Sequence, residues 1–570
     1  MCSDRTFGTP TAVDTAAPAS GRKPMPRLHL SPRAVLSPGA ALGAIASIGI
    51  AVGPAAAQQL GPLTRITGPS PFAGCTADRV GEQEGINYPN TEIEPWVAAD
   101  PRRPNRLLTG WQQDRWSNGG SRGLLAGASS NGGASWTTRV PGKVTKCEDG
   151  PFTRASDPWV DFTPNGIAYF MHLAFEPDQP DGGFGDNAML VTRSTDGGLS
   201  WGGPITLRSD TDPQVLNDKN SLRADPTNAN FAYAVWDRLI DFTLPPGAAE
   251  AAAAGAGDGV VRARERVRQL RAAASGTGER QPTELFFTGP VWFARTINGG
   301  LGWQPARQIF ATGPNSQTIN NLIEVTPGGT VIDFHTRIFA NGGTRIGLLR
   351  SFDRGATFRG PTYAATITTV NGVVTPDAQE LVRDASILFD SAVDPANGNL
   401  YLVWQDVRFT GQDAIAFTMS TNGGVSWSAP VRINKTPRNP NPLRQQAFVP
   451  SIEVGPRGQL VVTYYDFRND RDNGREATDF WAVFCDSRAT NCRQPASWGL
   501  ERRLTNQSFD MLDAPIARGH FLGDYMGLTR AGNAVIPVFG IATAPDRTAL
   551  FTRRINFGAA SAEVASALVE

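Results

Sequence analysis

The sequence is poor in histidine and shows no excess of charge of either sign. Its 570 residues include only four histidines and no Cys-x-x-Cys motif, so the usual ligand spacings of a zinc site are missing. The 53 basic and 53 acidic residues balance, which gives no general affinity for nucleic acid. Charged residues make up only 19% of the chain, which argues against disorder. We therefore expect a folded protein that uses no metal or other cofactor and binds no nucleic acid.

A long uninterrupted hydrophobic run is also missing. Residues 25–33 are basic, and the apolar stretch 34–57 that follows contains Pro38, Pro54 and several glycines before it ends in Ala-Ala-Ala-Gln. A basic segment, an apolar segment and a small-residue cleavage site are typical of a signal peptide. The interruptions argue against the alternative, a membrane anchor. We expect residues 1–57 to be a leader and signal peptide, with Met25 a candidate start, and the protein to be secreted or periplasmic.

Cysteine is scarce but suits an exported protein. Of the five cysteines, Cys2 belongs to the leader. Cys485 and Cys492 flank a six-residue loop that a disulfide can close, and Cys75 and Cys147 remain as the other available pair.

Glycine and proline are abundant, and much of the glycine lies in one repeated motif. The motif has the form Ser/Thr-x-Asp/Asn-x-Gly-x-x-aromatic. Its copies span residues 129–136, 194–201, 296–303, 351–358 and 420–427. Asp or Asn can bond its own backbone to form a turn, and Gly supplies the positive φ that a tight turn needs. Five copies in phase with an aromatic residue indicate an internal repeat of hairpins.

A second repeated phrase precedes each turn motif and raises the count of units to seven. It consists of a short apolar strand, a Pro/Asn/Gly turn and a longer apolar strand. The copies begin near Glu94, Asp157, Asp218, Asn320, Asp384, Val449 and Asp524. Units of about four short strands that repeat along a chain predict an all-β fold, a β-propeller of four-stranded blades. Seven blades are favoured, and six are the alternative if the last unit only completes the ring.

The predicted propeller occupies residues 58–570 as one domain. Residues near 63–67 are candidates for a strand that closes the ring beside the last blade. An Ala/Gly-rich insertion with several arginines lies at about 240–285. It is either a tolerated surface insertion or a basic lid, and the first is favoured because loop tips accept such additions.

The turn motif also indicates which face of the propeller carries chemistry. If it joins the third and fourth strands, it shares a face with the turns between the first and second strands. The first strand then begins, and the second ends, on the opposite face. Acids begin several first strands, and arginines follow the ends of the second strands at Arg115, Arg238, Arg337, Arg408 and Arg468. Either neighbouring Asp and Arg side chains pair and tie the blades together, or some of these arginines clamp an anionic ligand.

The turn motif resembles the Asp-box, or BNR repeat, of the sialidase superfamily, over about residues 90–560. In that family the boxes are structural and lie away from the active site. The resemblance implies three arginines on a substrate carboxylate, a Tyr nucleophile activated by a Glu, and an Asp as acid/base. The family's Arg-Ile-Pro stretch is absent, so candidates are assigned here from their expected place on the face. The candidate catalytic residues are Tyr525, Asp524, Tyr465, Asp157 and Glu94.

Two functions compete. The first is an exported, sialidase-like glycoside hydrolase that acts on a terminal sugar, with anionic sugars among the candidates. The alternative is a non-catalytic propeller that binds a glycan or a protein through the same face. A carbohydrate or glycoconjugate is the expected partner, without stable membrane insertion. An enzyme should show a concave pocket with unpaired arginines, whereas a binder should show every Asp and Arg paired.

Overall fold

The computed structural model describes residues 58–179, 182–242, 286–370 and 372–558, which belong to one compact unit, Ala56–Glu570. Their regular structure consists of β-strands and short 3₁₀ segments, without an α-helix in the described ranges. The predicted all-β class is confirmed. The predicted leader lies outside these residues, as does most of the insertion expected at about 240–285. No helix of the described part of the chain is long and apolar enough to cross a membrane.

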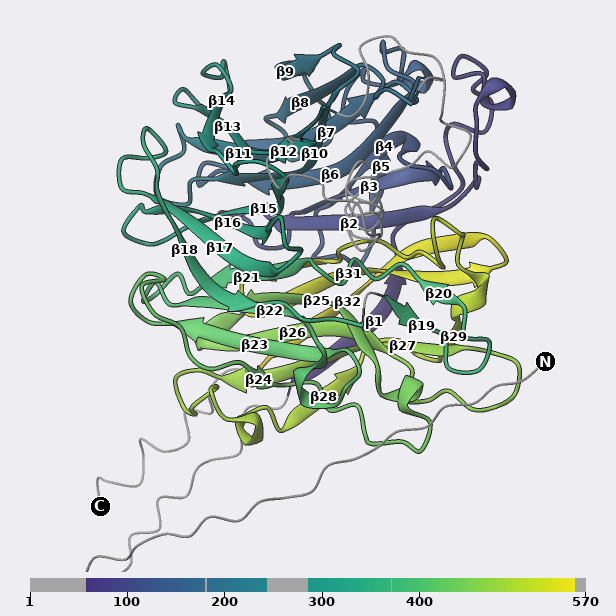
Figure 1. Cartoon of the computed structure of the whole chain (residues 1–570), viewed down its shortest axis with the longest axis vertical. Coiled ribbons are helices and arrows are strands. Elements are labelled where there is room, and N and C mark those ends of the chain that lie inside the picture. Colours follow the sequence, from purple (N-terminus) through teal and green to yellow (C-terminus); the bar gives the residue numbers. More distant parts are fainter. Residues whose placement is uncertain (1–57, 180–181, 243–285, 371, 559–570) are drawn as a thin grey trace, which may run out of the picture. The chain divides into compact units, whose positions relative to one another are not determined.

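The strands form consecutive antiparallel meanders (Figure 1). The first two are β2 (Glu92–Ala99), β3 (Leu107–Arg115), β4 (Ser121–Ser129), β5 (Thr137–Arg139), and β6 (Arg154–Phe162), β7 (Ala168–Phe175), β8 (Asn187–Ser194), β9 (Ile205–Asp210). The next two are β10 (Val215–Ala224), β11 (Ala232–Asp241), β13 (Val291–Thr296), β14 (Arg307–Phe310), and β15 (Ser316–Val325), β16 (Val331–Ile338), β17 (Thr344–Ser351), β18 (Arg359–Thr366). Short β12 (Phe287–Gly289) joins this pair of meanders into one sheet.

The C-terminal part of the chain continues the pattern. Its meanders are β21 (Phe389–Val393), β22 (Leu400–Asp406), β23 (Ala414–Ser420), β24 (Val431–Arg432), and β25 (Ala447–Val454), β26 (Gln459–Asp466), β27 (Ala477–Asp486), β28 (Leu500–Arg503). β30 (Gly527–Ala531), β31 (Ala534–Ala544) and β32 (Arg547–Phe557) follow. Three short strands lie between or beside the meanders: β19 (Val373–Val374), β20 (Leu381–Val382) and β29 (Phe509–Asp510).

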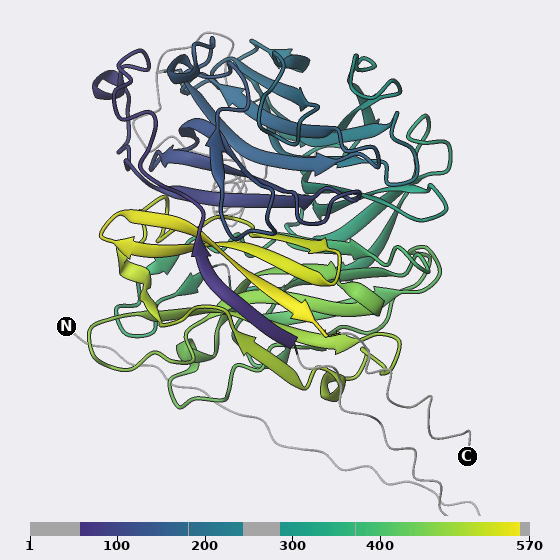
Figure 2. The same cartoon turned by 180° about the vertical axis from the view of Figure 1, so that it is seen from behind.

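The N-terminal strand completes the last of these sheets. β1 (Gln58–Arg65) pairs antiparallel with β32, with Leu63 opposite Arg553 and Arg65 opposite Phe551. In Figure 2 this purple strand runs beside the yellow C-terminal strands. The predicted closing strand is confirmed, although it begins earlier in the chain than residues 63–67.

The first strands of the meanders pack against one another in order. β2 contacts β6, and the contacts continue through β10, β15, β21 and β25 to β30, which packs against β2 again. The first strands therefore surround a common centre. Because strand pairs alternate their side chains between two faces, each first strand places every second side chain toward neighbouring meanders.

Each repeated turn motif links the third and fourth strands of a meander. In the motif that follows β8, Ser194 donates to Asp196 at 2.8 Å, and its hydroxyl accepts from the Gly198 amide at 2.9 Å. Gly197 and Gly198 both have positive φ, at 85° and 90°. In the β4–β5 motif, the Gly132 amide donates to Asn105 in the turn between β2 and β3. The motif thus shares an end of the sheet with that turn, as predicted.

Each of several first strands contains an irregular step near its start. Left-handed backbone recurs in these strands at Glu94, Asp157, Lys219, Asn320 and Val449, and before β21 at Ala385, with φ between 47° and 59°. The pairing register shifts beside most of these residues, for example between Ile93 and Trp96 in β2. A bulge of this kind re-aims the side chains next to it. It gathers these positions at the start of the first strands, opposite the repeated turns.

Both predicted disulfides are present. Cys75 pairs with Cys147, and Cys485 pairs with Cys492. The first ties the segment between β1 and β2 to the loop before β6. Asp78 of that segment also binds Arg122 of β4 at 2.6 Å. The second closes the loop that takes the place of a turn motif after β27.

Candidate functional site

Three predicted carboxylates meet at the start of the first strands, around one lysine. The Lys219 ammonium lies 2.6 Å from Asp524 Oδ2, 3.8 Å from Glu94 Oε1 and 3.9 Å from Asp157 Oδ1. All four side chains are at most 6% exposed. The chain brings them together from three meanders and from the segment before β30. Mutual pairing is what allows so many charges to be buried at one place.

Asp524 is the best-held carboxylate of this cluster. Arg383 donates to it in bidentate fashion, from Nε at 2.9 Å and Nη2 at 2.7 Å, and Lys219 also donates to Oδ2. Burial alone would raise the pKa of Asp524, but the two cations outweigh burial and hold it well below its usual value. Asp524 is therefore ionised at neutral pH.

Glu94 has the opposite character. Burial raises its pKa to about 8, and Lys219 opposes this shift only in part. One carboxyl oxygen accepts from the Asp524 amide at 3.2 Å, and the other contacts Gln112 Nε2. Gln112 also donates to Ser156, which donates to Asp157 at 3.1 Å. Glu94 and Asp157 are thus joined by a polar network as well as by Lys219.

A small central cavity of ≈ 20 Å³, with room for about one water molecule, opens beside this cluster. Trp96, Trp159 and Tyr525 form an aromatic part of its wall, and the two indoles stack with centroids 3.6 Å apart. The Tyr525 hydroxyl is buried and has no hydrogen-bond partner among the described residues. Burial raises the pKa of Tyr525 well above its usual value, and the charges of Asp157 and Glu94 raise it further. Tyr525 therefore stays a neutral phenol.

Three aspartates line the same cavity: Asp384, Asp390 and Asp524. Asp384 accepts from the Val373 amide at 3.0 Å and from Gln405 at 2.9 Å. Asp390 accepts from the amides of Ile452 and Ser391. Burial raises the pKa of Asp390 to about 8 against these two bonds. The cavity therefore holds one aspartate that keeps its proton at neutral pH and one, Asp524, that does not.

Glu94, Asp157 and Lys219 do not line the cavity themselves. They adjoin it through Asp524, which both Lys219 and the Glu94 carboxyl contact. Asp157 lies 3.9 Å from the Lys219 ammonium and adjoins Asp524 only through that lysine.

Tyr465, the other predicted nucleophile, lies elsewhere. It belongs to β26 and packs among Phe448, Phe480 and Phe509. Its side chain is fully buried, and its hydroxyl donates to the Gly540 carbonyl at 2.7 Å. Burial raises its pKa well above the usual value. The structure does not bring Tyr465 to the carboxylate cluster, because alternation along β26 turns it into the core.

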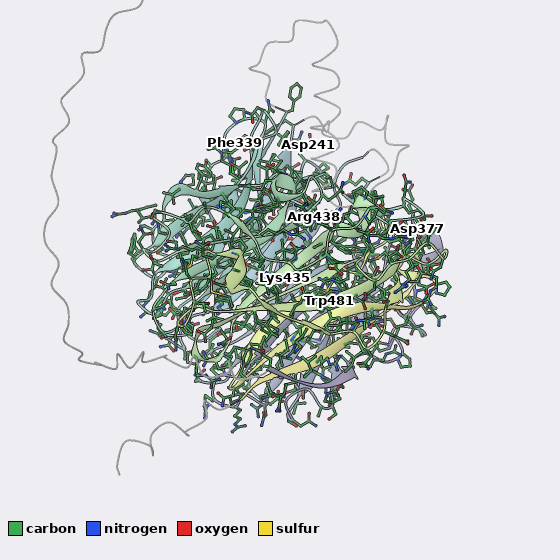
Figure 3. The ribbon with its side chains drawn as sticks, turned by 90° about the horizontal axis from the view of Figure 1, so that it is seen from below. Asp241, Phe339, Asp377, Lys435, Arg438 and Trp481 are labelled. Carbon is green, nitrogen blue, oxygen red and sulfur yellow. A yellow bond between two sulfur atoms is a disulfide. The ribbon has the colours of Figure 1, made fainter. Side chains whose placement is uncertain are left out.

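The five predicted binding arginines do not form a common clamp, and none of them lines the cavity. Arg238 binds Asp210, Arg408 binds Asp406, and Arg468 binds Asp466. Arg468 also lies over the ring of Trp481, labelled in Figure 3. Arg337 contacts the Thr312 carbonyl and lies over Phe310. Arg115 alone approaches the cluster, where it donates to Gln112 at 2.6 Å.

Sequence reasoning missed Lys219, Arg383 and Asp390. The repeat offers a signal for Lys219, because Lys219 occupies the left-handed position of Glu94 and Asp157, whereas the sequence pattern alone aligns Asp218 with them. Arg383 directly precedes Asp384, and only the packing of distant segments brings it to Asp524. Asp390 lies inside β21, beyond the strand starts that the repeat singled out.

The described residues offer a single group of three close metal-ligand candidates: Cys75, Asp78 and Cys147. Both cysteines form the disulfide, and Asp78 binds Arg122. This group is therefore occupied by protein contacts.

No protein-family model matches the chain, and no curated protein matches it either. Among solved structures, a protein of unknown function from Dyadobacter fermentans DSM 18053 aligns with a TM-score of 0.43 and 13% identity, over 83% of this chain and 97% of that one. The Hadza microbial sialidase Hz136 aligns with a TM-score of 0.41 and 15% identity, over 79% of this chain and 74% of that one. A Penicillium chrysogenum α-L-arabinanase aligns with a TM-score of 0.38 and 11% identity, over 87% of this chain and 98% of that one.

Proposed function

We propose that the protein is an exported glycoside hydrolase that binds a terminal sugar over the mouth of the small central cavity, at the start of the first strands. The scaffold is inferred to be a seven-bladed propeller of the Asp-box type. In this proposal each meander is a blade, β1 completes the last blade, and the five repeated turns fasten the outer strands. The first strands then line the central channel, where the cavity lies.

The observation that carries the proposal is the contrast between Asp390 and Asp524 in one cavity. Burial keeps the first protonated, and Arg383 with Lys219 keeps the second ionised. Glycosidases generally need such a pair, one carboxyl group to protonate the leaving oxygen and one carboxylate to assist attack. Groups in one site whose pKa values are driven apart mark the acid and the base.

In the proposed reaction, Asp390 donates its proton to the glycosidic oxygen as the bond to the anomeric carbon breaks. Asp524 supplies the negative charge that stabilises the positive sugar carbon and helps water to add to it. The water's surplus proton passes to the ionised Asp390, which restores the starting state of both carboxyl groups. Lys219, Arg383, Glu94 and Asp157 act on Asp524 and are positioning residues. Tyr525 donates a hydrogen bond to the sugar, since the surrounding carboxylates oppose its ionisation.

A screen of the protein against chromogenic glycosides, sialosides included, tests this function. Turnover of at least one glycoside is expected. Tyr525→Phe should lower kcat/KM by about tenfold, the value of one hydrogen bond to the sugar. Tyr465→Phe is the matched control and should leave kcat/KM unchanged. An absence of turnover on every glycoside would refute the hydrolase.

A non-catalytic glycan-binding protein is the second candidate. The pairing of Arg238, Arg408 and Arg468 with aspartates favours it, because paired charges are what a binding face predicts. The aromatic wall of Trp96 and Trp159 suits sugar stacking in either case. Glycan binding without turnover would select this candidate.

A further inference from the structure

Exposed apolar side chains gather on the repeated turns of four consecutive meanders, which follow β8, β13, β17 and β23. These side chains are Leu199, Ile297, Leu301, Phe352 and Val425, which are 49%, 46%, 75%, 67% and 70% exposed. The copy of the motif after β4 has Ser130 and Ala134 at the same two positions. It forms its turn with the same serine bond to the second glycine. The turn itself therefore does not require the large apolar residues.

A groove lies between the turns of the fourth and fifth meanders, beside two of these side chains. Phe352 and Val425 line it together with Pro327, Ile332 and Ala396. Its volume is ≈ 410 Å³. This end of the molecule thus presents apolar surface both on protruding turns and in a hollow between them.

An arginine directly precedes three of the four turns and adds positive charge beside them. Arg193 donates to the Gly299 carbonyl at 2.8 Å, and Arg350 donates to the Gly423 carbonyl at 2.9 Å. In both cases the carbonyl belongs to the turn of the next meander. Arg295 contacts a carbonyl of the fourth meander's turn in the same way. A carbonyl accepts the hydrogen bond but leaves the charge of the guanidinium uncompensated.

The four turns and the arginines beside them carry an excess of positive charge. Arg307 is exposed and also donates to carbonyls of the fourth meander's turn. Arg354 within that turn is balanced by Asp225 at 2.9 Å. The acids of the four turns are Asp196 and Asp353, which accept hydrogen bonds inside their own turns. Four arginines that bind carbonyls thus stand against two aspartates.

Exposed apolar residues in such a group mark a contact with another protein or with a membrane. Here they stand on separate turns, and Leu301, Phe352 and Val425 are each at least 67% exposed. Separate protruding side chains enter a soft bilayer interface one by one, whereas a rigid protein partner must match their relief. The arginines among them complement anionic lipid headgroups. A second copy of this chain would instead place like charges opposite one another in a symmetric contact.

From the apolar turns and the arginines together, we infer that this face docks onto an anionic lipid bilayer. The apolar side chains of the turns enter the headgroup region, and Arg193, Arg295, Arg307 and Arg350 attract the lipid phosphates. Docking of this kind is peripheral and needs no membrane-spanning helix. The starts of the first strands, with the carboxylate cluster, then face away from the bilayer. The inference goes beyond the proposed function and does not depend on it.

Co-sedimentation of the full chain with phosphatidylglycerol vesicles and with phosphatidylcholine vesicles tests the inference. Binding to phosphatidylglycerol should be at least about tenfold tighter and should weaken as salt is added. Leu301→Ser/Phe352→Ser should lower the affinity for phosphatidylglycerol vesicles by at least about tenfold. Ile516→Ser, at a 47% exposed residue in the segment before β30, is the matched control and should leave the affinity unchanged. Residues 1–57 are the same in all three proteins, so differences between them report on the turns.

Equal binding of wild type and the double variant, an equal affinity for the two lipids, or no binding would each overturn the inference. Sedimentation velocity without lipid tests the other occupant, a second copy of this chain. Self-association that the double variant loses, with unchanged vesicle binding, would assign the face to that copy and refute membrane docking. Because these assays contain no glycoside, their outcome is independent of whether the protein is a hydrolase.

Discussion

Lys219 and Asp524 form a buried ion pair of 2.6 Å between residues 305 positions apart. Lys219 belongs to the third meander, and Asp524 precedes the last. The same ammonium lies within 3.9 Å of Glu94 and Asp157. One cation thus balances carboxylates from across the ring of first strands and links the strands electrostatically.

Replacement of this lysine should destabilise the fold. Lys219→Met leaves buried carboxylates without their shared cation, which typically costs about 3–5 kcal/mol. Urea denaturation measures the loss in unfolding free energy. Lys143→Met, the same change at an exposed position, should alter it by less than about 0.5 kcal/mol. A loss as small as the control's would show that the cluster is not held by Lys219.

Stability should fall as the pH rises from 6.5 to 8.5. Burial raises the pKa values of Glu92, Glu94 and Glu148 from 4.5 to about 8. The folded state binds these protons more tightly, so the stability they give is complete below pH 4.5 and is lost as the pH passes through about 8. Burial lowers the pKa of His172 to about 3. This shift makes stability rise with pH between about 3 and about 6.5, and it adds no further change above about pH 6.5.

Denaturant midpoints at pH 6.5, 7.5 and 8.5 measure this trend. Each of the three carboxyl groups lowers the free energy of unfolding by at most about 2 kcal/mol between pH 6.5 and 8.5. Glu148→Gln removes one titrating group, so its curve should be shallower. A midpoint that rises or stays constant over the window would contradict the assignment.

A methyl group at Gly198 should be costly. Its φ of 90° is unfavourable for any other residue, and an added Cβ would lie 2.6 Å from Leu108 Cδ1. Gly198→Ala should therefore lower the unfolding free energy by about 1–3 kcal/mol. At Gly203 no atom lies within 4 Å of the added Cβ, so Gly203→Ala should be nearly neutral. Equal costs would mean that this turn does not hold the sheet.

The two disulfides should stabilise the folded state by different amounts. Cys75–Cys147 spans 72 positions and Cys485–Cys492 spans 7. Loop-closure entropy then gives about 4 kcal/mol for the first and about 2 kcal/mol for the second. Denaturation of the Cys75→Ser/Cys147→Ser and Cys485→Ser/Cys492→Ser variants compares them. A larger loss in the second variant would contradict the entropic account.

The repeated turns were predictable because their hydrogen bonds are local. Ser194, Asp196 and Gly198 satisfy one another within five residues, so the motif encodes its own shape. The disulfides were predictable because Cys485 and Cys492 flank a short loop, which leaves Cys75 and Cys147 as the other pair. The closing strand was predictable because it lies at the N-terminal end of the predicted propeller. The predicted gathering of Glu94, Asp157 and Asp524 also agrees with the structure, because the first strands share an orientation.

What could not be read from the sequence depends on distant packing. The bulges at the strand starts decide which residue of Asp218-Lys219-Asn220 faces the centre, and no local pattern shows this. Arg408 and Arg468 pair with Asp406 and Asp466 two residues away. The recurring Asp and Arg at the ends of the second strands therefore form local ion pairs. The protonation states of Asp390 and Asp524 depend on burial and on Arg383, 141 positions from Asp524.

The proposed function requires Asp390 to be the proton donor of a glycoside hydrolase. The most direct measurement is the pH profile of kcat for wild type and Asp390→Asn on the best glycoside of the screen. Wild-type kcat should fall as the pH rises through about 8, where Asp390 loses its proton. Asp390→Asn should lower kcat by about 10²–10⁴-fold. Glu92→Gln, the control for a buried carboxyl of similar pKa outside the cavity, should retain activity. A folded Asp390→Asn variant with wild-type kcat would show that Asp390 is not the proton donor.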